Sequence, residues 1–297
     1  ENMDLYLNSG DIYALLAAFC WSSGIILFEL SGKVLDSLQI NILKNFIGLI
    51  GFFIVLLITS NLLISYTAYE YWLLVISAVL GVAVGDLFLL ASLKRLGSGL
   101  YAVAGTSYTL FIFLFAFLMF QEMISLQVYM GGILVILGIM IRSMTIPKHN
   151  GGIQLSRGIV YVLIAQALTA YSVLLVRPVM ENHPVVHIAM IRFGIGFVFN
   201  MLHLLWMRGL ECLKKTMIIG FSTPTMVAGA FMGTFLSVIF WLAGFKYTLA
   251  GRAAIYNQLS TILITIMAAI FLKEKMNRRS WMAVALAVVG AALVSTS

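Results

Sequence analysis

Four ionisable residues lie inside long apolar stretches, where a charge is costly and therefore informative. They are Glu29, Lys44, Asp86 and Arg192. A charge at the centre of a membrane helix costs about 2.5–3.5 kcal/mol on insertion scales, so such residues usually face a cavity or an opposite charge. The chemistry open to this set is recognition of a charged small molecule, and proton transfer by the carboxylates Glu29 and Asp86.

Lys44 and Asp86 are expected to form an ion pair. Each lies a similar number of residues from the hairpin that joins their two apolar stretches, so both should reach the same depth. Leaving either charge alone would be costly, which favours pairing. The functional interpretation is a charged site in a cavity, with Asp86 or Glu29 as a proton-coupling carboxylate. The alternative is a structural ion pair or a side chain that extends to the membrane surface.

Aromatic and amide side chains in the same stretches are further candidates for a binding cavity. Tyr101 and Tyr108 are seven residues apart, so they share one face of a helix. Inside an apolar stretch the polar atom of a Tyr or Trp needs a hydrogen-bond partner, which a cavity supplies. The remaining candidates are Trp21, Tyr171, Trp241, Tyr256, Asn257 and Gln258. Each could instead pack between helices or lie in an aromatic belt at the membrane surface.

Motifs of enzymes and metal sites fail on inspection. Ala83-Val84-Gly85-Asp86 is similar to the GxGD motif of intramembrane aspartyl proteases, but Ala83 replaces the first Gly and no Tyr-Asp dipeptide completes it. His183 and His187 have helical spacing, but Pro184 is expected to start a helix between them. No phosphate-binding P-loop is present in the sequence. We therefore expect no catalytic activity, no metal and no cofactor.

The elements that position these residues are indicated by composition. Hydrophobic residues make up 62% of the 297 and charged residues 10%, whereas a soluble domain carries about 25% charged residues. The net charge of +7 does not indicate nucleic acid, because no basic run is long enough to follow a phosphate backbone. The expected partner is the lipid bilayer, in a multi-pass protein of the cell (inner) membrane.

Ten apolar stretches are each close to the roughly 20 residues that cross the hydrocarbon of a bilayer. They run over about 11–31, 37–59, 70–92, 98–120, 125–143, 156–178, 184–207, 224–245, 251–272 and 279–296. The pattern predicts an all-α membrane protein with ten transmembrane helices.

The second half of the chain repeats the first. Matching residues recur 152 positions apart, as in Lys94 and Lys246, Gly99 and Gly251, Glu122 and Glu274, and Gly138 and Gly290. The small residues Ser77, Gly81 and Gly85 recur as Gly229, Gly233 and Ser237, and such ridges suit close helix packing. Nearer the start of each half the spacing is 148, so Lys44 matches Arg192. We expect two five-helix repeats, over 1–147 and 148–297.

An odd number of crossings in each half inserts the two repeats in opposite orientations. Inverted repeats are recurrent in alternating-access transporters, whose substrate site lies near the midplane where the repeats meet. Glu122 and Glu274 fall at the ends of helices, and their recurrence suggests a structural role such as capping the following helix.

Arg192 differs from its counterpart Lys44 in lacking a matching carboxylate. The residue that corresponds to Asp86 in the second half is Val238. An unpaired guanidinium beside a cavity favours an anionic or zwitterionic cargo group. Alternatively, Arg192 reaches the membrane surface or bonds to a backbone carbonyl.

Two segments carry a resemblance to a known family. Residues 96–141 and 248–294 each have a small-residue start to a helix, a long apolar run, a Glu, and then a helix that contains Gly. In this they resemble the two EamA repeats of the drug/metabolite transporter superfamily, and the resemblance covers essentially the whole chain. It implies a ten-helix inverted-repeat fold, a central cavity lined largely by the first four helices of each half, and transport of small metabolites.

The sequence departs from that family pattern in two places. Gln121 and Lys273 precede the repeat Glu residues, where members often have Gly. Tyr108-Thr109 and Ser260-Thr261 stand where members often have Pro. Members carry very different substrates, so the resemblance does not identify the cargo.

The sequence favours a secondary transporter of a small polar metabolite, with an amino acid or related zwitterion first among the cargoes. Protons are a candidate coupling ion, through Asp86 or Glu29. One alternative is a transporter of a phosphate-bearing cargo such as a nucleotide sugar, which would use Lys44 and Arg192. Another is a membrane scaffold or receptor that transports nothing, and it should tolerate the loss of Lys44, Asp86 and Arg192.

Basic residues also predict the orientation in the membrane. The links after the odd-numbered stretches hold most of the Lys and Arg residues, whereas the other links hold only Arg177, Lys246 and Arg252. Cytoplasmic loops carry the excess of Lys and Arg, so this asymmetry places both termini outside. The family resemblance would instead place both termini inside.

Overall fold

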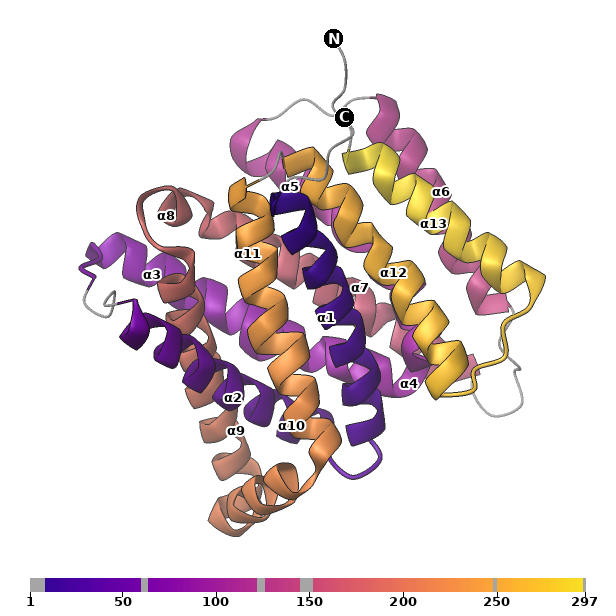
Figure 1. Ribbon diagram of the computed structural model, residues 1–297. Helices are drawn as coiled ribbons and strands as arrows, with labels where there is room; N and C mark the ends of the chain where they lie inside the picture. Colours follow the sequence, from indigo (N-terminus) through magenta and orange to yellow (C-terminus); the bar gives the residue numbers. More distant parts are fainter. Residues whose placement is uncertain (1–8, 60–63, 122–125, 145–151, 248–249, 296–297) are drawn as a thin grey trace.

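The computed structural model describes residues 9–59, 64–121, 126–144, 152–247 and 250–295, and every regular element in these ranges is a helix. Six helices are long and apolar enough to cross a membrane, and shorter apolar helices accompany them. We call the end of the helix bundle where the first helix, α1, begins the proximal face, and the end where α1 finishes the distal face. Figure 1 shows the proximal face at the top.

The first half makes five crossings. They are α1 (Ser9–Ser31); α2 (Ser37–Ile58); α3 (Ala68–Ser77) with the π-helix η1 (Ala78–Gly85) and the start of α4 (Asp86–Gly105); the end of α4 with α5 (Ser107–Phe120); and α6 (Leu126–Met144). α4 contains both crossings because Gly97, at φ 71°, turns the chain back at the distal face. The expected helices of this half are present, with bounds that differ by a few residues.

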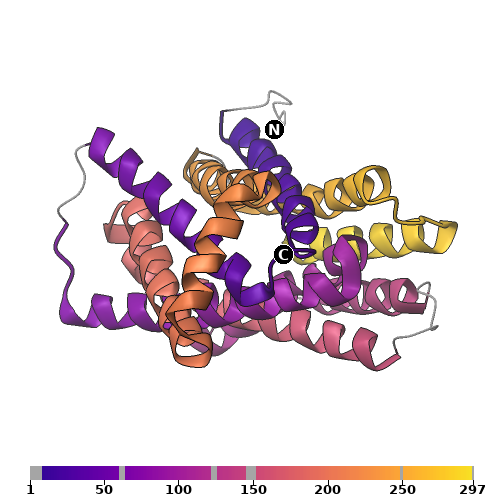
Figure 2. The ribbon, with the colours of Figure 1, turned by 90° about the horizontal axis from the view of Figure 1, so that it is seen from below.

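The second half repeats this arrangement. Its elements are α7 (Gly152–Leu175), the short α8 (Arg177–Asn182), α9 (Val185–Ser222), α10 (Pro224–Ala230) with the π-helix η3 (Phe231–Leu236) and α11 (Ser237–Tyr247), α12 (Ala250–Phe271) and α13 (Arg278–Ser295). The described chain therefore crosses ten times, as an all-α membrane protein of two inverted five-helix repeats. Figures 1 and 2 place α6 and α13 together at one end of the molecule and α2, α3 and α9 at the other.

Local sequence signals start and stop these helices. Asp36 caps α2 by accepting a hydrogen bond from the Gln39 backbone N–H at 3.0 Å, and the Gln39 side chain accepts one from the Asp36 backbone at 2.9 Å. Pro224 is the first residue of α10, since proline suits the first turn of a helix, and Pro184 directly precedes α9 as its N-cap residue. Gln121 and Lys273, equivalent in the two repeats, both follow helix ends with positive φ, at 57° and 56°.

The small-residue ridges bring the two halves into close contact. A Cβ added to Gly24 of α1 would lie 2.3 Å from the Cα of Gly233 in η3. In the other half, a Cβ on Gly81 of η1 would lie 2.2 Å from the Oγ of Ser172 in α7. Ser172 corresponds to Gly24 and Gly233 to Gly81, so the same contact occurs twice, related by the internal symmetry. The first helix of each repeat thus packs on the third crossing of the other.

One expected link is helical. The sequence suggests a loop after residue 207, but α9 continues to Ser222 beyond a break at Gly209, which has φ 76°. Figure 1 shows this last part of α9 folded across the lower, distal end of the molecule. The span expected over 156–178 also ends earlier, at Leu175, and α8 follows it. Short helices at membrane surfaces escape a hydropathy pattern because they carry both charged and apolar residues.

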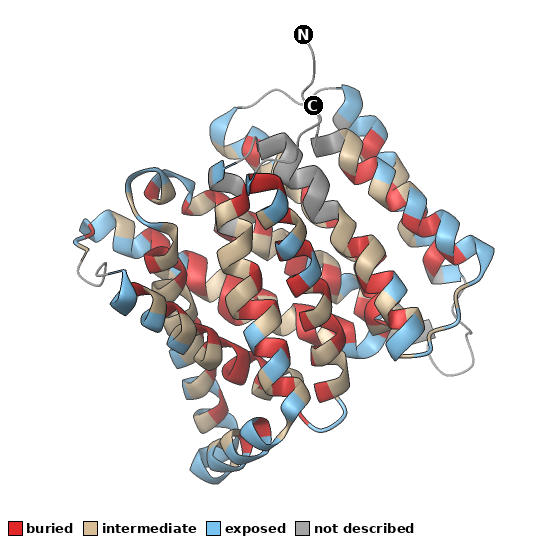
Figure 3. Cartoon of the chain, in the orientation of Figure 1, coloured by how far each residue is buried: buried red, intermediate tan, exposed pale blue. Residues whose placement is uncertain are grey.

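Burial agrees with a membrane setting. Figure 3 shows buried residues along the central helices and exposed residues on the outer ones. Many of the exposed residues are large and apolar, such as Ile58, Trp72 and Ile270, with exposed fractions of 78%, 66% and 64%. Surface of this kind suits lipid, because acyl chains do not penalise apolar contact.

Candidate functional site

A cavity of about 330 Å³ lies where the two repeats meet. Its volume is in the range of small-molecule sites. The first helices of both halves line it, together with the third and fourth crossings and α9. The sequence candidates that line it are Trp21, Asp86, Tyr101, Tyr108, Arg192 and Trp241.

The Lys44–Asp86 ion pair expected from the sequence is present at one wall of this cavity. Lys44 Nζ lies 2.6 Å from Asp86 Oδ2 and donates a second hydrogen bond to Asn45 Oδ1 at 2.9 Å. The exposed fraction of the side chain is 7% for Lys44 and 18% for Asp86. Asp86 lines the cavity, whereas Lys44 lies behind it on α2. Asp86 begins α4 directly after η1, and π-helical segments are frequent at functional sites.

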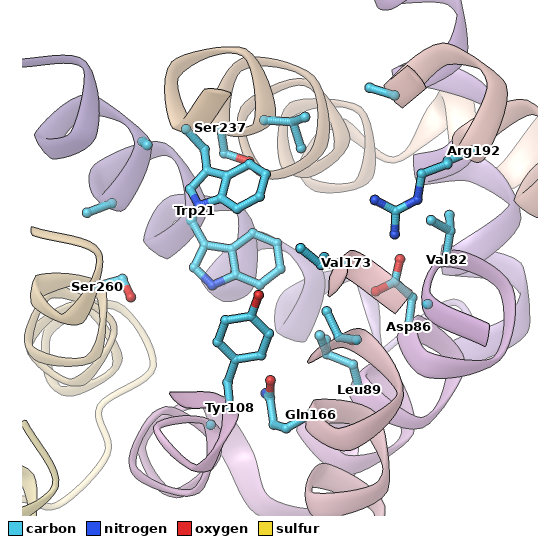
Figure 4. Close-up of a pocket in the computed structure, with 18 of the residues that line it drawn as sticks. Trp21, Val82, Asp86, Leu89, Tyr108, Gln166, Val173, Arg192, Ser237 and Ser260 are labelled. Carbon is cyan, nitrogen blue, oxygen red and sulfur yellow. The ribbon is translucent and has the colours of Figure 1, made fainter. Parts of the chain in front are cut away.

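Arg192 projects from α9 toward the same cavity. Its Nη2 donates to Ser172 Oγ at 3.1 Å. In the described part of the chain no carboxylate lies within 4 Å of Arg192, and its buried Nε has no hydrogen-bond partner. Gly81 makes room for this arrangement, because a Cβ there would lie 3.2 Å from Arg192 Nη2. Figure 4 shows Arg192 and Asp86 facing each other at one side of the cavity.

Aromatic rings occupy the other side of the cavity. In Figure 4 the rings of Trp21 and Tyr108 lie together, away from Arg192 and Asp86. Tyr101 is buried and shares a hydrogen bond with Gln166. Phe193 lines the charged side of the cavity, with its ring centroid 5.3 Å from Lys44 Nζ. The cavity therefore offers both charged groups and aromatic surface, which fits an amphipathic cargo.

Several lining residues carried no strong signal in the sequence. They are uncharged polar residues of ordinary type, namely Gln166, Thr169, Ser237, Ser260 and Thr261. Thr169 Oγ1 is buried without a hydrogen-bond partner in the described structure. The repeat offered a partial signal, since Ser260-Thr261 corresponds to Tyr108-Thr109.

Other sequence candidates lie elsewhere. Tyr171 does not line the cavity; its ring packs edge-on against Phe115, with centroids 5.5 Å apart. Tyr256, Asn257 and Gln258 lie outside the residues whose side chains the structure describes.

Glu29 lies at the distal end, away from the cavity, where two carboxylates meet the start of one helix. A new helical segment begins after the turn at Gly97. The backbone N–H groups of its first residues have no hydrogen-bond partner within the helix, as at any helix N-terminus. Ser98 N donates to Glu29 Oε2 at 2.6 Å, and Gly99 N donates to Glu274 Oε1 at 3.3 Å. Arg142 also contacts Glu274, at 3.3 Å. The contacts of Glu274 join the two repeats at the distal face, whereas the Glu29 bond joins α1 to α4 within the first repeat. All of them lie beyond the residues that line the cavity.

The role expected for Glu274 requires correction. It does not cap the helix that follows it, because Asn277 does so by accepting a hydrogen bond from Ser280 N at 2.8 Å. Glu274 instead contacts the fourth helix of the other repeat at Gly99. Sequence spacing could not reveal this contact, since the two residues are far apart in the chain. Glu122, its counterpart, lies outside the described residues.

At the proximal end, the cavity reaches the α8–α9 connection, where Met180 and Val185 line it. His183 and His187, considered above as a metal pair, bond there to different partners. His183 Nε2 lies 3.0 Å from Glu70 Oε1, and His187 Nδ1 lies 2.8 Å from the hydroxyl of Tyr66. Burial raises the pKa of Tyr66 to about 12, so the hydroxyl group that bonds to His187 stays protonated.

Comparisons with known proteins agree with this architecture. The profile of the EamA-like transporter family matches residues 8–144 and again 156–296. An uncharacterized transporter of Archaeoglobus fulgidus is 23% identical over 268 residues, which cover 90% of this chain and 91% of the relative. A solved crystal structure of a protein that is 16% identical superposes with a TM-score of 0.67 and covers 96% of each chain, which shows the fold. The chain is a multi-pass integral membrane protein and belongs to the EamA-like transporter family.

Proposed function

We propose that the protein is a secondary transporter of a small zwitterion, with amino acids first among the cargoes. The observation that carries this proposal is the placement of Arg192 and Asp86, from opposite repeats, on one wall of the shared cavity. The cargo carboxylate binds Arg192, and the cargo ammonium group faces Asp86. Arginine suits a carboxylate because its planar fork donates two parallel hydrogen bonds.

Unsatisfied polar atoms support a ligand at this position. Buried polar atoms are normally hydrogen-bonded, so Arg192 Nε and Thr169 Oγ1 are exceptions that a bound molecule would satisfy. Lys44 bonds to Oδ2 of Asp86, and we assign Oδ1 to the ammonium group of the cargo. Lys44 partly neutralises Asp86, which allows this carboxylate to remain charged inside the membrane.

The proximal and distal ends of the cavity differ, and this difference indicates how an alternating-access cycle would proceed. The described cavity extends to the proximal connection between α8 and α9, while Glu274 bonds to Gly99 and Arg142 of the other repeat at the distal face. Cargo therefore enters or leaves on the proximal side in this state. Breaking the distal bonds and closing the proximal end would expose the same site to the other side.

A phosphate-bearing cargo is less favoured by the same geometry. Asp86 would repel a phosphate dianion held at Arg192, and Lys44 is already engaged by Asp86. A scaffold that transports nothing would not need these charges near an apolar cavity, where they are costly. Both alternatives are addressed by the experiment below.

Uptake into proteoliposomes, over a panel of amino acids and phosphate esters, tests the proposal. Arg192→Gln should raise KM for the transported zwitterion roughly 10–100-fold, because hydrogen bonds to charged groups are worth about 1.5–3 kcal/mol. Arg192→Lys should recover part of this loss, since it keeps the charge but not the fork. Arg95→Gln, which removes an exposed arginine, is the matched control and should transport normally. Unchanged zwitterion uptake by Arg192→Gln, or uptake of phosphate esters alone, would contradict the proposal.

Proton coupling, if it drives this cycle, is assigned to Asp86 or Glu29. Glu29 shares its helix start with Glu274, and a proton bound by either carboxylate relieves their mutual repulsion. A proton on Glu274 would weaken the distal bonds that join the repeats, and a proton on Glu29 would weaken the bond between α1 and α4. The variants Asp86→Asn and Glu29→Gln, separately and together, should lose accumulation driven by a pH difference. A double variant that still concentrates cargo with a pH difference would exclude both residues.

A further inference from the structure

The last part of α9, residues 210–222, is a surface helix docked on the distal end of α2. Gly209 turns the chain before it, at φ 76° and ψ 176°. The inner side of the helix places Cys212, Leu213 and Met217 against a cluster that includes Leu38 and Ile42. Thr216 is fully buried and accepts a hydrogen bond from Gln39 Nε2 at 2.9 Å. The surface helix is therefore held in a fixed position and is not a loose link.

The opposite side of the surface helix exposes a mixture of apolar and basic residues. Two of them also contact the protein: the Phe221 ring lies edge-on to Phe46, with centroids 6.2 Å apart, and Lys214 Nζ lies 3.3 Å from Glu211 Oε1. Leu210, Ile218 and Phe221 have exposed fractions of 56%, 68% and 50%. Lys214 and Lys215 are exposed among them. Large apolar residues interspersed with lysines are typical of helices that lie in the plane of a membrane surface.

The surface helix continues directly from a membrane-crossing segment. The residues just before the break are Trp206 and Met207, with exposed fractions of 82% and 59%. Tryptophan is enriched where a crossing meets the lipid headgroups. Trp206 therefore places the surface helix at headgroup level, next to the lipid that surrounds α9.

The charge at this level is positive. Lys33, Lys94, Arg95 and Lys275 are exposed at the same distal face. Arg208, beside the break, pairs with Asp36 at the start of α2. Lysines near a membrane surface attract anionic lipids. Charge complementarity thus favours anionic headgroups over neutral ones.

We propose that residues 210–222 bind the headgroups of anionic phospholipids through Lys214 and Lys215, while Leu210, Ile218 and Phe221 enter the edge of the acyl layer. This interaction anchors the distal end of α2, the helix that carries Lys44. The proposal concerns a lipid surface and does not depend on the identity of the cargo.

Lipid retention by the full chain tests the headgroup contact. The protein is purified from vesicles of phosphatidylcholine mixed with phosphatidylglycerol, and the retained lipids are counted by native mass spectrometry. Lys214→Gln with Lys215→Gln should lower the retained phosphatidylglycerol roughly ten-fold relative to phosphatidylcholine. The matched control, Lys94→Gln with Lys275→Gln, removes the same charge from the same face away from the helix. An equal loss in both double variants, or no loss in either, would overturn the proposal.

A fluorophore reports the depth of the surface helix. An environment-sensitive dye is attached to Phe221→Cys or to Asn277→Cys, an exposed position in another distal link, in a background without Cys20 and Cys212. The dye at position 221 should show blue-shifted emission in the mixed vesicles, and the dye at 277 should remain aqueous. Aqueous emission at both positions would overturn membrane insertion. Disulfide cross-linking between two Phe221→Cys chains would identify a second copy of the chain as the occupant, and would overturn the proposal as well.

Discussion

At the scale of single residues, the site depends on which partner each charged side chain has inside the membrane. Lys44 Nζ lies 2.6 Å from Asp86 Oδ2, so each of these side chains has an oppositely charged partner. Arg192 is held by a neutral partner, Ser172, and its charge is therefore available to a ligand. The two cations occupy equivalent positions in the repeats, but we propose different roles for them: Lys44 positions Asp86, and Arg192 binds cargo.

Removing Lys44 alone should destabilise the protein. Lys44→Met leaves Asp86 buried without its partner, and breaking a buried pair typically costs about 3–5 kcal/mol. Thermal unfolding of the purified protein in detergent measures the effect. The double variant Lys44→Met with Asp86→Leu should recover most of the lost stability, because it leaves no lone charge. A Lys44→Met protein that unfolds at the wild-type temperature would mean that Asp86 finds another partner.

At the scale of elements, contacts between small residues set how closely the repeats approach. The paired contacts of Gly24 with Gly233 and of Ser172 with Gly81 hold the first helix of each repeat on the π-helical part of the other. These π-helical segments lie immediately before the cavity-lining residues Asp86 and Ser237, so helix packing and site geometry are linked. The sequence predicted the ridges, but not which helices they contact.

Gly24→Ala should weaken the contact between repeats. The added Cβ would lie 2.3 Å from the Gly233 Cα, a backbone atom that cannot move without its helix. Overpacking of this kind typically costs about 1–3 kcal/mol. Gly194→Ala is the matched control, because its Cβ would meet only Leu49 Cδ1 at 3.4 Å. Unfolding temperatures compare the two variants, and an equal change in both would show that the close approach at Gly24 is unimportant.

At the scale of the whole molecule, the inverted repeats enclose a shared cavity between the proximal and distal faces, and these two faces differ. The cavity reaches the proximal end, and Glu274 joins the two repeats at the distal end through Gly99 and Arg142. The alternating-access cycle proposed above must exchange these conditions, so the two ends are expected to differ in each state.

Basic residues predict that the distal face is cytoplasmic. Single cysteines at Ser65, on the proximal side, and at Asn277, on the distal side, test this in intact cells without the native Cys20 and Cys212. A membrane-impermeant thiol reagent should label Ser65→Cys and leave Asn277→Cys unlabelled, because excess Lys and Arg remain inside. Labelling at Asn277→Cys with protection of Ser65→Cys would establish the opposite orientation.

The sequence by itself determined the elements and their symmetry. Apolar length and the positions of charges between crossings define membrane helices, because a bilayer leaves the backbone few other choices. The repeated glycines and the matched depths of Lys44 and Asp86 were equally visible, and their ion pair followed from the cost of an unpaired charge.

Only the tertiary structure decided which residues share the cavity. Gln166 and Thr169 lie there because α7 packs against η1 and α4, and ordinary polar residues give no signal of such a contact. Tyr171 lies on the same helix, and its residue type suits a binding cavity, but its ring packs against Phe115. Glu274 reaches Gly99 across the repeats, a contact that spacing along the chain cannot indicate. Sequence periodicity describes one helix at a time, whereas a cavity depends on how several helices pack together.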